Sequence, residues 1–256
     1  MVAGESDFEL AELFGHYRIS KDTTSTEFSI AGSKMRFDTS RSSVTYSRFT
    51  GGEFVAQSTI LTDKEQALIG VFPVPPIFTP KQVAMNLYLK FRFPVIVDQR
   101  SEVVVYARMP IEIGVFRQSE DEEMLIDVYS PTPQKYALYG PPESGVVCRY
   151  TDSEAAATKE DVALEKYQDA LVRIRIRNGI DNIVKISKVI IPMDGVILDH
   201  AHDEAWLPGS VEMGLDSAFG KDIVNVRLVD VKVKTVDKTS LIKKEETRTF
   251  RMDAGY

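Results

Sequence analysis

Cysteine and long apolar runs are scarce in this sequence of 256 residues. The single cysteine, Cys148, cannot form an internal disulfide, so nothing supports an oxidising compartment and we expect a cytoplasmic protein. Residues 1–7 lack the basic flank and apolar run of an export signal. The longest stretch without charge, residues 66–80, contains four prolines and is shorter than the roughly 18 apolar residues that a spanning helix needs. We therefore expect no direct membrane insertion.

Familiar catalytic and nucleotide-binding motifs are also absent. No Gly-x-Ser-x-Gly sequence provides a nucleophile elbow, and Cys148 has only Arg149 beside it. The glycines at Gly51, Gly52 and Gly214 lack the spacing and the following Lys and Ser or Thr of a phosphate loop. The net charge of -7, from 31 basic and 38 acidic residues, argues against nucleic-acid binding. These absences predict a protein without a cofactor that binds rather than catalyses.

A period of two dominates the first 150 residues. In residues 83–93, apolar side chains occupy every second position: Val83, Met85, Leu87, Leu89, Phe91 and Phe93. Shorter alternating runs follow, separated by polar turns, which predicts an antiparallel meander. We expect residues 1–150 to form an N-terminal antiparallel β domain.

The pattern changes between residues 151 and 159, where small and polar residues predict a domain boundary. Thr158 followed by Asp161 resembles a helix N-cap, which predicts one short connecting helix. Alternation then returns, and about 90 residues of such strands match the size of an immunoglobulin-like β-sandwich. We therefore expect a mainly β protein with two antiparallel β domains, the second of which, residues 160–256, is this sandwich.

Four stretches together resemble an archaeal family of proteins known only as domain of unknown function 432. They are Tyr46-Ser47-Arg48, FPVPPIFTP at 72–80, FRFPV at 91–95 and MPIEIGV at 109–115. The resemblance covers most of the chain from Phe14 onward. It implies no activity and no catalytic residues. It implies one partner hypothesis, which is association with a small-conductance mechanosensitive channel.

A metal site is predicted by the acidic and histidine-bearing sequence DHAHDE at 199–204. His200 and His202 are separated by one residue, so on an extended segment their side chains point the same way. With Asp203 or another carboxylate of the segment they would hold a divalent metal. This reading makes the protein a metal-dependent enzyme. The alternative is a solvated polar loop, because glycine and proline flank the segment.

Three arginines, Arg173, Arg175 and Arg177, share one face of a predicted strand. Three cations within roughly 14 Å would suit phosphate, a sulfated sugar or an acidic partner. The alternative is an exposed sheet face balanced by cross-strand acids such as Asp194 or Asp222.

Tyr88 and Tyr129 fall on the polar side of their strands with Tyr106 and Phe116, which predicts an aromatic face. Glycan stacking on this face would make the protein a carbohydrate-binding module, whereas packing beneath the other domain or at a homodimer contact is the alternative. Taken together, the residues predict a noncatalytic protein-interaction or ligand-binding β module, with a protein partner or a second copy of the chain.

Overall fold

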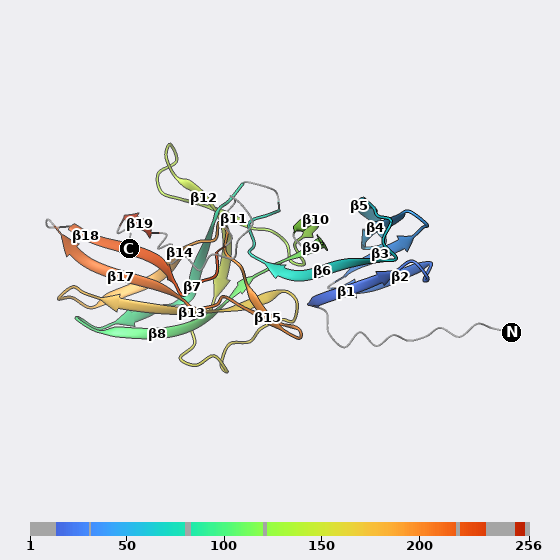
Figure 1. Cartoon of the computed structure of the whole chain (residues 1–256). Helices are drawn as coiled ribbons and strands as arrows, with labels where there is room; N and C mark the ends of the chain where they lie inside the picture. The colour runs from blue at the N-terminus through green and yellow to red at the C-terminus, as the bar shows by residue number, and fades with distance from the viewer. Residues whose placement is uncertain are drawn as a thin grey trace. The chain divides into compact units, whose positions relative to one another are not determined.

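The computed structural model describes residues 14–30, 32–79, 83–119, 122–218, 221–233 and 249–253, and the side chains of residues 218, 221, 222 and 249–253 are not described (Figure 1). These residues form strands and turns and no helix, so the prediction of a mainly β protein is confirmed. No part of the described chain is a helix long and apolar enough to cross a membrane.

Contacts divide the chain into two units. Unit 1 contains residues 1–72, 115–127 and 201–203, and unit 2 contains the remainder. The boundaries lie away from the predicted one between residues 151 and 159. The chain enters and leaves each unit more than once, which a division into an N-terminal and a C-terminal part does not capture.

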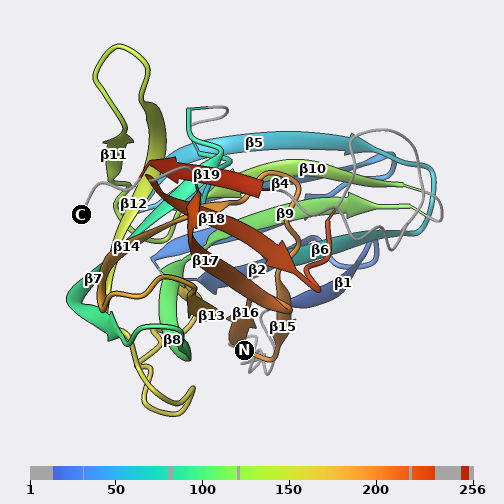
Figure 2. The same ribbon diagram turned by 90° about the vertical axis from the view of Figure 1, so that its left-hand side faces the viewer.

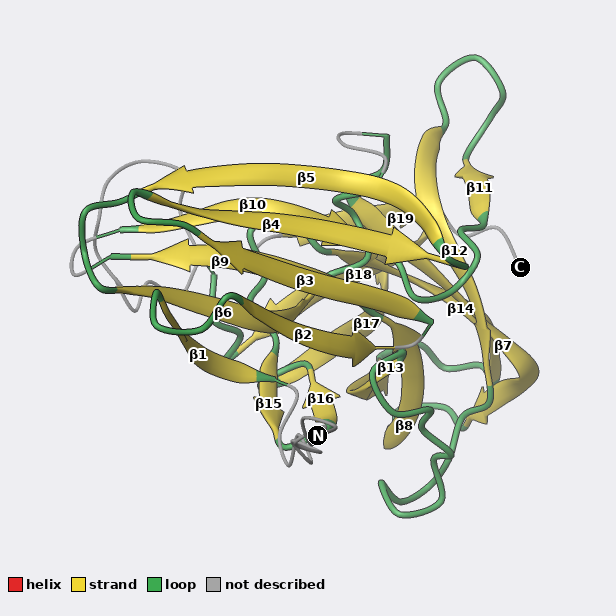
Figure 3. Cartoon of the chain, turned by 90° about the vertical axis from the view of Figure 1, so that its right-hand side faces the viewer, coloured by secondary structure: helices red, strands yellow, loops and turns green. Residues whose placement is uncertain are grey.

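Unit 1 is built from two four-stranded antiparallel layers, which Figure 3 shows from one side. One sheet has the order β2-β3-β4-β5 and the other the order β1-β6-β9-β10. Their strands are β1 (Gly15–Ser20), β2 (Ser25–Ile30), β3 (Ser33–Thr39), β4 (Ser43–Thr50), β5 (Glu53–Leu61), β6 (Gln66–Val74), β9 (Glu112–Gln118) and β10 (Glu123–Tyr129). The last residues of β6, the first of β9 and the end of β10 belong to unit 2.

Alternation in the sequence places one face of each strand in the core of unit 1. In β3, Met35 and Phe37 are buried, whereas Lys34 and Arg36, which alternate with them, are exposed. A series of rings from successive strands fills the core. Neighbouring ring centroids lie 4.6, 5.7 and 5.2 Å apart in the order Tyr17, Phe28, Phe37 and Tyr46. Aromatic packing of this kind adds stabilisation beyond the burial of apolar area.

A buried ion pair joins the two sheets of unit 1. Asp127 on β10 accepts hydrogen bonds from Arg48 Nε at 2.6 Å and from the Tyr46 hydroxyl at 2.7 Å. Tyr46 and Arg48 are two residues apart on β4, so both side chains point to the same face and reach one carboxylate. The Arg48 and Asp127 side chains are only 9% and 11% exposed. We call these three residues the unit 1 anchor.

Unit 2 combines a four-stranded sheet, order β11-β12-β7-β14, with a seven-stranded sheet (Figure 2). The larger sheet has the order β15-β16-β13-β17-β18-β19, and β8 pairs with β13. The strands are β7 (Asn86–Val97), β8 (Glu102–Pro110), β11 (Tyr136–Tyr139), β12 (Val146–Ser153), β13 (Asp169–Asn178), β14 (Val184–Pro192), β15 (Asp199–Ala201), β16 (Glu204–Trp206), β17 (Ser210–Ala218), β18 (Lys221–Val229) and β19 (Thr249–Asp253). Apolar residues of both sheets, such as Leu87, Leu89, Ile174 and Ile176, are buried between them.

Strand pairing differs from the prediction in three respects. The antiparallel meander does not form, because β7, β8 and β9 follow one another in sequence but belong to three different sheets. Two strands of residues 160–256 pair with partners from the other half of the chain: β13 with β8 and β14 with β7. That segment therefore does not close a sandwich on its own. Some pairs are also parallel, namely β12 with β7 and β13 with β16 and β17.

The predicted connecting helix does not form either, since the residues after Thr158 are turns. The Thr158 hydroxyl donates to the side chain of Asp161 at 2.7 Å instead of capping a backbone N–H group. Tyr167 has a φ of 60°, a left-handed conformation that a helix cannot accommodate. The two residues that resembled a helix cap therefore bond to each other, and no helix begins at Thr158.

A second buried carboxylate, Glu112 of β9, holds the proline-rich segment that follows β6. Its oxygens accept the backbone N–H groups of Phe78 at 2.9 Å and Thr79 at 3.1 Å, and the residue is 0% exposed. Burial raises the pKa of the Glu112 carboxyl to about 7, although the Phe78 amide, the charge of Arg149 and the Thr79 amide each oppose that rise. Glu112 is therefore the buried acid of unit 2, and we call it the unit 2 anchor.

Removal of the acid in the unit 1 anchor should be strongly destabilising. We expect Asp127→Ala to lower the free energy of unfolding by about 3–5 kcal/mol, because it leaves the Arg48 guanidinium buried without a counter-ion. Urea unfolding measures this change. The matched control is Asp38→Ala on β3. Asp38 forms an ion pair with Arg36, and the two side chains are 40% and 44% exposed, respectively. The control should change stability by less than about 0.5 kcal/mol, and equal losses in both variants would contradict the role of the anchor.

The unit 2 anchor predicts a specific pH dependence. The pKa of Glu112 in the folded protein, about 7, lies above the ordinary value of 4.5, so the stabilisation from proton binding is present below about pH 4.5 and is lost as the pH rises to about 7. Wild type should therefore lose about 3 kcal/mol relative to Glu112→Gln across that interval. Urea unfolding at pH 4.5, 6 and 7.5 measures this difference.

The control for this titration is Glu154→Gln, which removes an exposed carboxyl that pairs with Arg92. It should alter stability by less than about 0.5 kcal/mol at each pH. If wild type instead gained stability over Glu112→Gln with rising pH, the attraction of Arg149 would outweigh burial and the assignment would be wrong.

Candidate functional site

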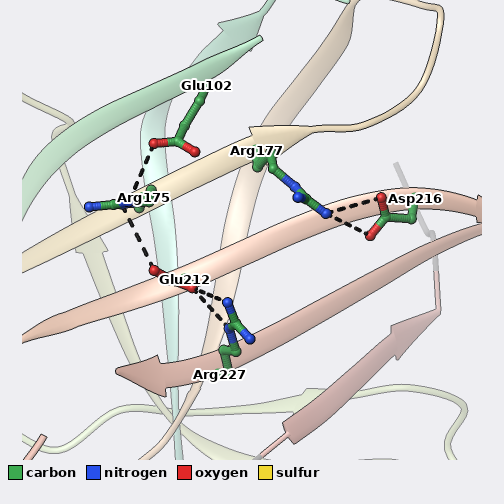
Figure 4. A network of polar contacts seen from close by, with 6 residues as sticks. All are labelled: Glu102, Arg175, Arg177, Glu212, Asp216 and Arg227. Carbon is green, nitrogen blue, oxygen red and sulfur yellow. Dashed lines mark hydrogen bonds and ion pairs between the residues drawn. The ribbon is translucent and has the colours of Figure 1, made fainter. Parts of the chain in front are cut away.

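A polar hollow of about 640 Å³ lies on one face of the seven-stranded sheet of unit 2. Its walls and floor come from four neighbouring strands, β8, β13, β17 and β18. The lining residues are Glu102, Arg175, Arg177, Glu212, Met213, Gly214, Asp216, Asn225 and Arg227. We call this site the charged hollow. Figure 4 shows its six charged residues.

Strand register explains why residues far apart in the sequence meet here. Arg175 lies opposite Glu212, and Glu212 lies opposite Arg227, so these three side chains form one row across the sheet. In the next row Arg177 lies opposite Gly214, which lies opposite Asn225. Glu102 on β8 extends that second row, because it is the partner of Arg177 on the other side.

Each carboxylate of the charged hollow contacts a guanidinium group (Figure 4). The closest contacts are those of Arg227, whose Nη2 and Nε lie 2.6 and 2.9 Å from Glu212 Oε2. Arg177 Nη2 lies 3.4 Å from Asp216 Oδ1. Three guanidinium groups face three carboxylates, so their charges sum to zero. Because the paired side chains are 19% to 61% exposed, each pair contributes at most about 1 kcal/mol to stability.

Arg175 bridges two acids from different strands at longer distances. Its Nη1 lies 3.6 Å from Glu102 Oε1, and its Nε lies 3.9 Å from Glu212 Oε1. The guanidinium therefore forms ion pairs on both sides. Its Nε has no hydrogen-bond acceptor within the described structure.

Gly214 leaves an open position in the middle of the floor. A Cβ atom at this residue would meet only Asp216 Oδ2, at the ordinary contact distance of 3.7 Å. The backbone here does not require glycine, and the glycine instead leaves space between Arg177 and Asn225. The hollow owes part of its depth to this missing side chain.

The structure confirms that the three predicted arginines share a face of β13, but it assigns them different surroundings. Arg175 and Arg177 line the charged hollow, whereas Arg173 lies one step further along, opposite Tyr106. Glu102, Glu212 and Asp216 contact the arginines of the hollow, Asp194 is not among its lining residues, and the side chain of Asp222 lies outside the described ones. Alternation in residues 210–229 could have identified the acids only with the strand order known.

Tyr88 and Tyr129 do not share an exposed face. Tyr129 is 4% exposed, whereas Tyr88 is half-buried on the outer face of β7. The ring of Tyr88 lies 5.6 Å from that of Tyr150 and 6.3 Å from that of Tyr139, at interplanar angles of 39° and 61°. Lys188 lies over the Tyr139 ring at 5.6 Å. These tilted rings pack against one another and do not form a flat stacking surface.

The predicted metal ligands lie at a hairpin between β15 and β16. The extended geometry assumed for His200 and His202 ends at Ala201, because the chain turns at His202, which has a φ of 56°, and Asp203. The described residues contain no group of three or more His, Cys, Asp or Glu that could hold a metal ion. The metal site stays a prediction.

Comparison with known proteins identifies a family. No curated protein and no solved structure matches the chain. The family described as "Protein of unknown function (DUF432)" matches residues 13–253. This match confirms the resemblance carried by the motifs at 46–48, 72–80, 91–95 and 109–115. Since the match covers most of the sequence, the chain belongs to the DUF432 family.

Proposed function

We propose that this protein is a noncatalytic ligand-binding module and that the charged hollow holds a neutral, polyhydroxylated ligand such as an oligosaccharide. One observation carries the proposal: three guanidinium groups, three carboxylates and one amide surround a hollow of about 640 Å³ on the seven-stranded sheet. Ligand sites in proteins commonly have volumes of roughly 300–1,000 Å³.

The lining chemistry supports binding over catalysis. The lining residues of the hollow include no hydroxyl, thiol, imidazole or ammonium group, so no side chain there is a ready nucleophile. A carboxylate acting as a general acid or base must be available to the substrate. Each carboxylate of the hollow contacts an arginine, so the lining contains no carboxyl group set apart from the ion pairs as an acid or base, and the carboxylates remain acceptors for ligand hydroxyl groups.

The balance of charge supports a neutral ligand. An arginine stripe alone would favour phosphate or a sulfated sugar, but in this structure Glu102, Glu212 and Asp216 offset the three cations. An anion in the hollow would meet these carboxylates as well as the guanidinium groups. A hydroxyl group both donates and accepts, so it can bond to a carboxylate and to an arginine or asparagine at once. Adjacent hydroxyls of a sugar match this alternation of donors and acceptors.

The other predictions from the sequence are independent of this hollow. A protein partner or second copy, association with a mechanosensitive channel, cytoplasmic location, archaeal origin and a metal-dependent activity all stay predictions. A carbohydrate ligand is retained from the sequence, but we place it at the charged hollow rather than at Tyr88 and Tyr129.

The proposal is tested by filling the hollow without disturbing the fold. A glycan array identifies a neutral oligosaccharide ligand, and calorimetric titration then compares variants. We expect Gly214→Leu to weaken binding at least about tenfold, because its side chain occupies the floor between Arg177 and Asn225, while stability changes by less than about 1 kcal/mol. Arg177→Ala should also weaken binding, through loss of hydrogen-bond donors.

Arg92→Ala is the matched control, since Arg92 forms an equally exposed ion pair with Glu154 on another part of unit 2. Its affinity should equal that of wild type. The proposal fails if no neutral glycan binds, if only anionic glycans bind, or if Gly214→Leu binds as well as wild type.

A further inference from the structure

Arg149 of β12 is a buried cation whose donors are mostly unused. The residue is 1% exposed, and its Nη2 donates to the Ser130 hydroxyl at 3.2 Å. Among the described residues, its Nε and Nη1 have no hydrogen-bond acceptor. Buried polar groups in folded proteins are nearly always satisfied, and an exception calls for a bound water or ion. Burial also lowers the pKa of the Arg149 guanidinium, although Tyr136 and the charge of Glu112 oppose that change.

The neighbouring groups supply acceptors for only part of the guanidinium. The ring of Tyr136 covers it, with 5.5 Å between the ring centroid and Cζ, and the Tyr136 hydroxyl accepts a hydrogen bond from Arg149 and donates one to the Thr79 carbonyl at 3.0 Å. Nε and Nη1 are left without an acceptor among the described residues. Glu112 acts on Arg149 electrostatically, but its oxygens accept the amides of Phe78 and Thr79. The hydrogen bonds of Glu112 thus go to backbone amides, and its effect on Arg149 is that of its charge.

We infer that Arg149 anchors an enclosed site for a small inorganic anion such as chloride, and that this site fills when Glu112 is protonated. The charge of the ligand follows from the unpaired cation, and its size follows from burial. A guanidinium that is 1% exposed cannot be reached by a polyanion or a macromolecule. A small anion beside Arg149 Nε or Nη1 accepts a charge-assisted hydrogen bond that the protein does not provide.

The anion binds when Glu112 is protonated, because an ionised Glu112 would be a second negative charge close to Arg149. The groups that act on Glu112 are the amides of Phe78 and Thr79 and the charge of Arg149 on β12, while the titratable Tyr136 on β11 acts on Arg149. The Glu112 carboxyl has a pKa of about 7. If the neutral form alone admits the anion, the apparent affinity should rise about tenfold from pH 8 to pH 6.

Bromide is the probe for this site, used with the full chain. The thermal unfolding midpoint is recorded against sodium bromide concentration, with sodium gluconate keeping the ionic strength constant, and the midpoints give an apparent dissociation constant. For wild type we expect this constant to be about tenfold lower at pH 6 than at pH 8. Glu112→Gln should abolish the difference and give at pH 8 the affinity that wild type has at pH 6.

Two further variants separate the site from general salt effects. Arg149→Met should lose the bromide response, and Arg92→Gln, which changes an exposed arginine, should retain it. Because Arg149→Met can fail to fold, a crystal of wild type grown with bromide at pH 6 provides independent evidence. We expect an anomalous peak within hydrogen-bond distance of Arg149 Nε or Nη1.

Three results would overturn the inference. The first is a bromide response that is equal at pH 6 and pH 8 in wild type. The second is a response unchanged by Glu112→Gln. The third is a crystal in which water occupies the position beside Arg149 and bromide binds only at the surface.

Discussion

The cost of burying charge within stacked β-sheets is the constraint on which both units depend. An ionised group taken out of water needs a counter-charge, hydrogen bonds or a proton. In unit 1, Asp127 receives a guanidinium and a phenol hydroxyl from one strand of the opposite sheet. In unit 2, Glu112 receives two backbone amides and keeps a raised pKa. The buried acid of unit 1 thus has both a counter-charge and a hydrogen bond from a hydroxyl group. The buried acid of unit 2 has hydrogen bonds from two amides and binds a proton more readily than an exposed carboxyl.

Exposed and buried ion pairs therefore have different roles in this protein. The Arg48–Asp127 pair joins two sheets inside a core, where loss of one partner leaves an uncompensated charge. The pairs of the charged hollow are solvated, and each contributes little to stability. Fold stability thus gives no reason for the six charges to gather around Gly214. A ligand that uses both donors and acceptors does give such a reason, which is why the proposed function rests on this surface.

Side-chain alternation predicted the faces of the strands well and their partners poorly. The buried positions of β13 and β7, and the shared face of Arg175 and Arg177, follow from a period of two. That period contains no information on which strand lies alongside, so the meander and the self-contained C-terminal sandwich were wrong. Asp216 meets Arg177 across 39 residues of sequence because β17 runs parallel to β13. The charged hollow could not be assembled from the sequence without that pairing.

Three of the four motifs by which the chain resembles its family supply residues of the buried anchors or their hydrogen-bond partners. Tyr46 and Arg48 belong to the first motif and hold Asp127. The prolines of the run at 72–80 have no N–H group. Near the end of this run, the backbone N–H groups of Phe78 and Thr79 are donors that need an acceptor. Glu112, from the motif at 109–115, is that acceptor. The residues of the charged hollow lie outside all four motifs. These three motifs therefore contribute to how the core accommodates charge, and under the proposed function the choice of ligand depends on a separate set of residues on the surface of the larger sheet.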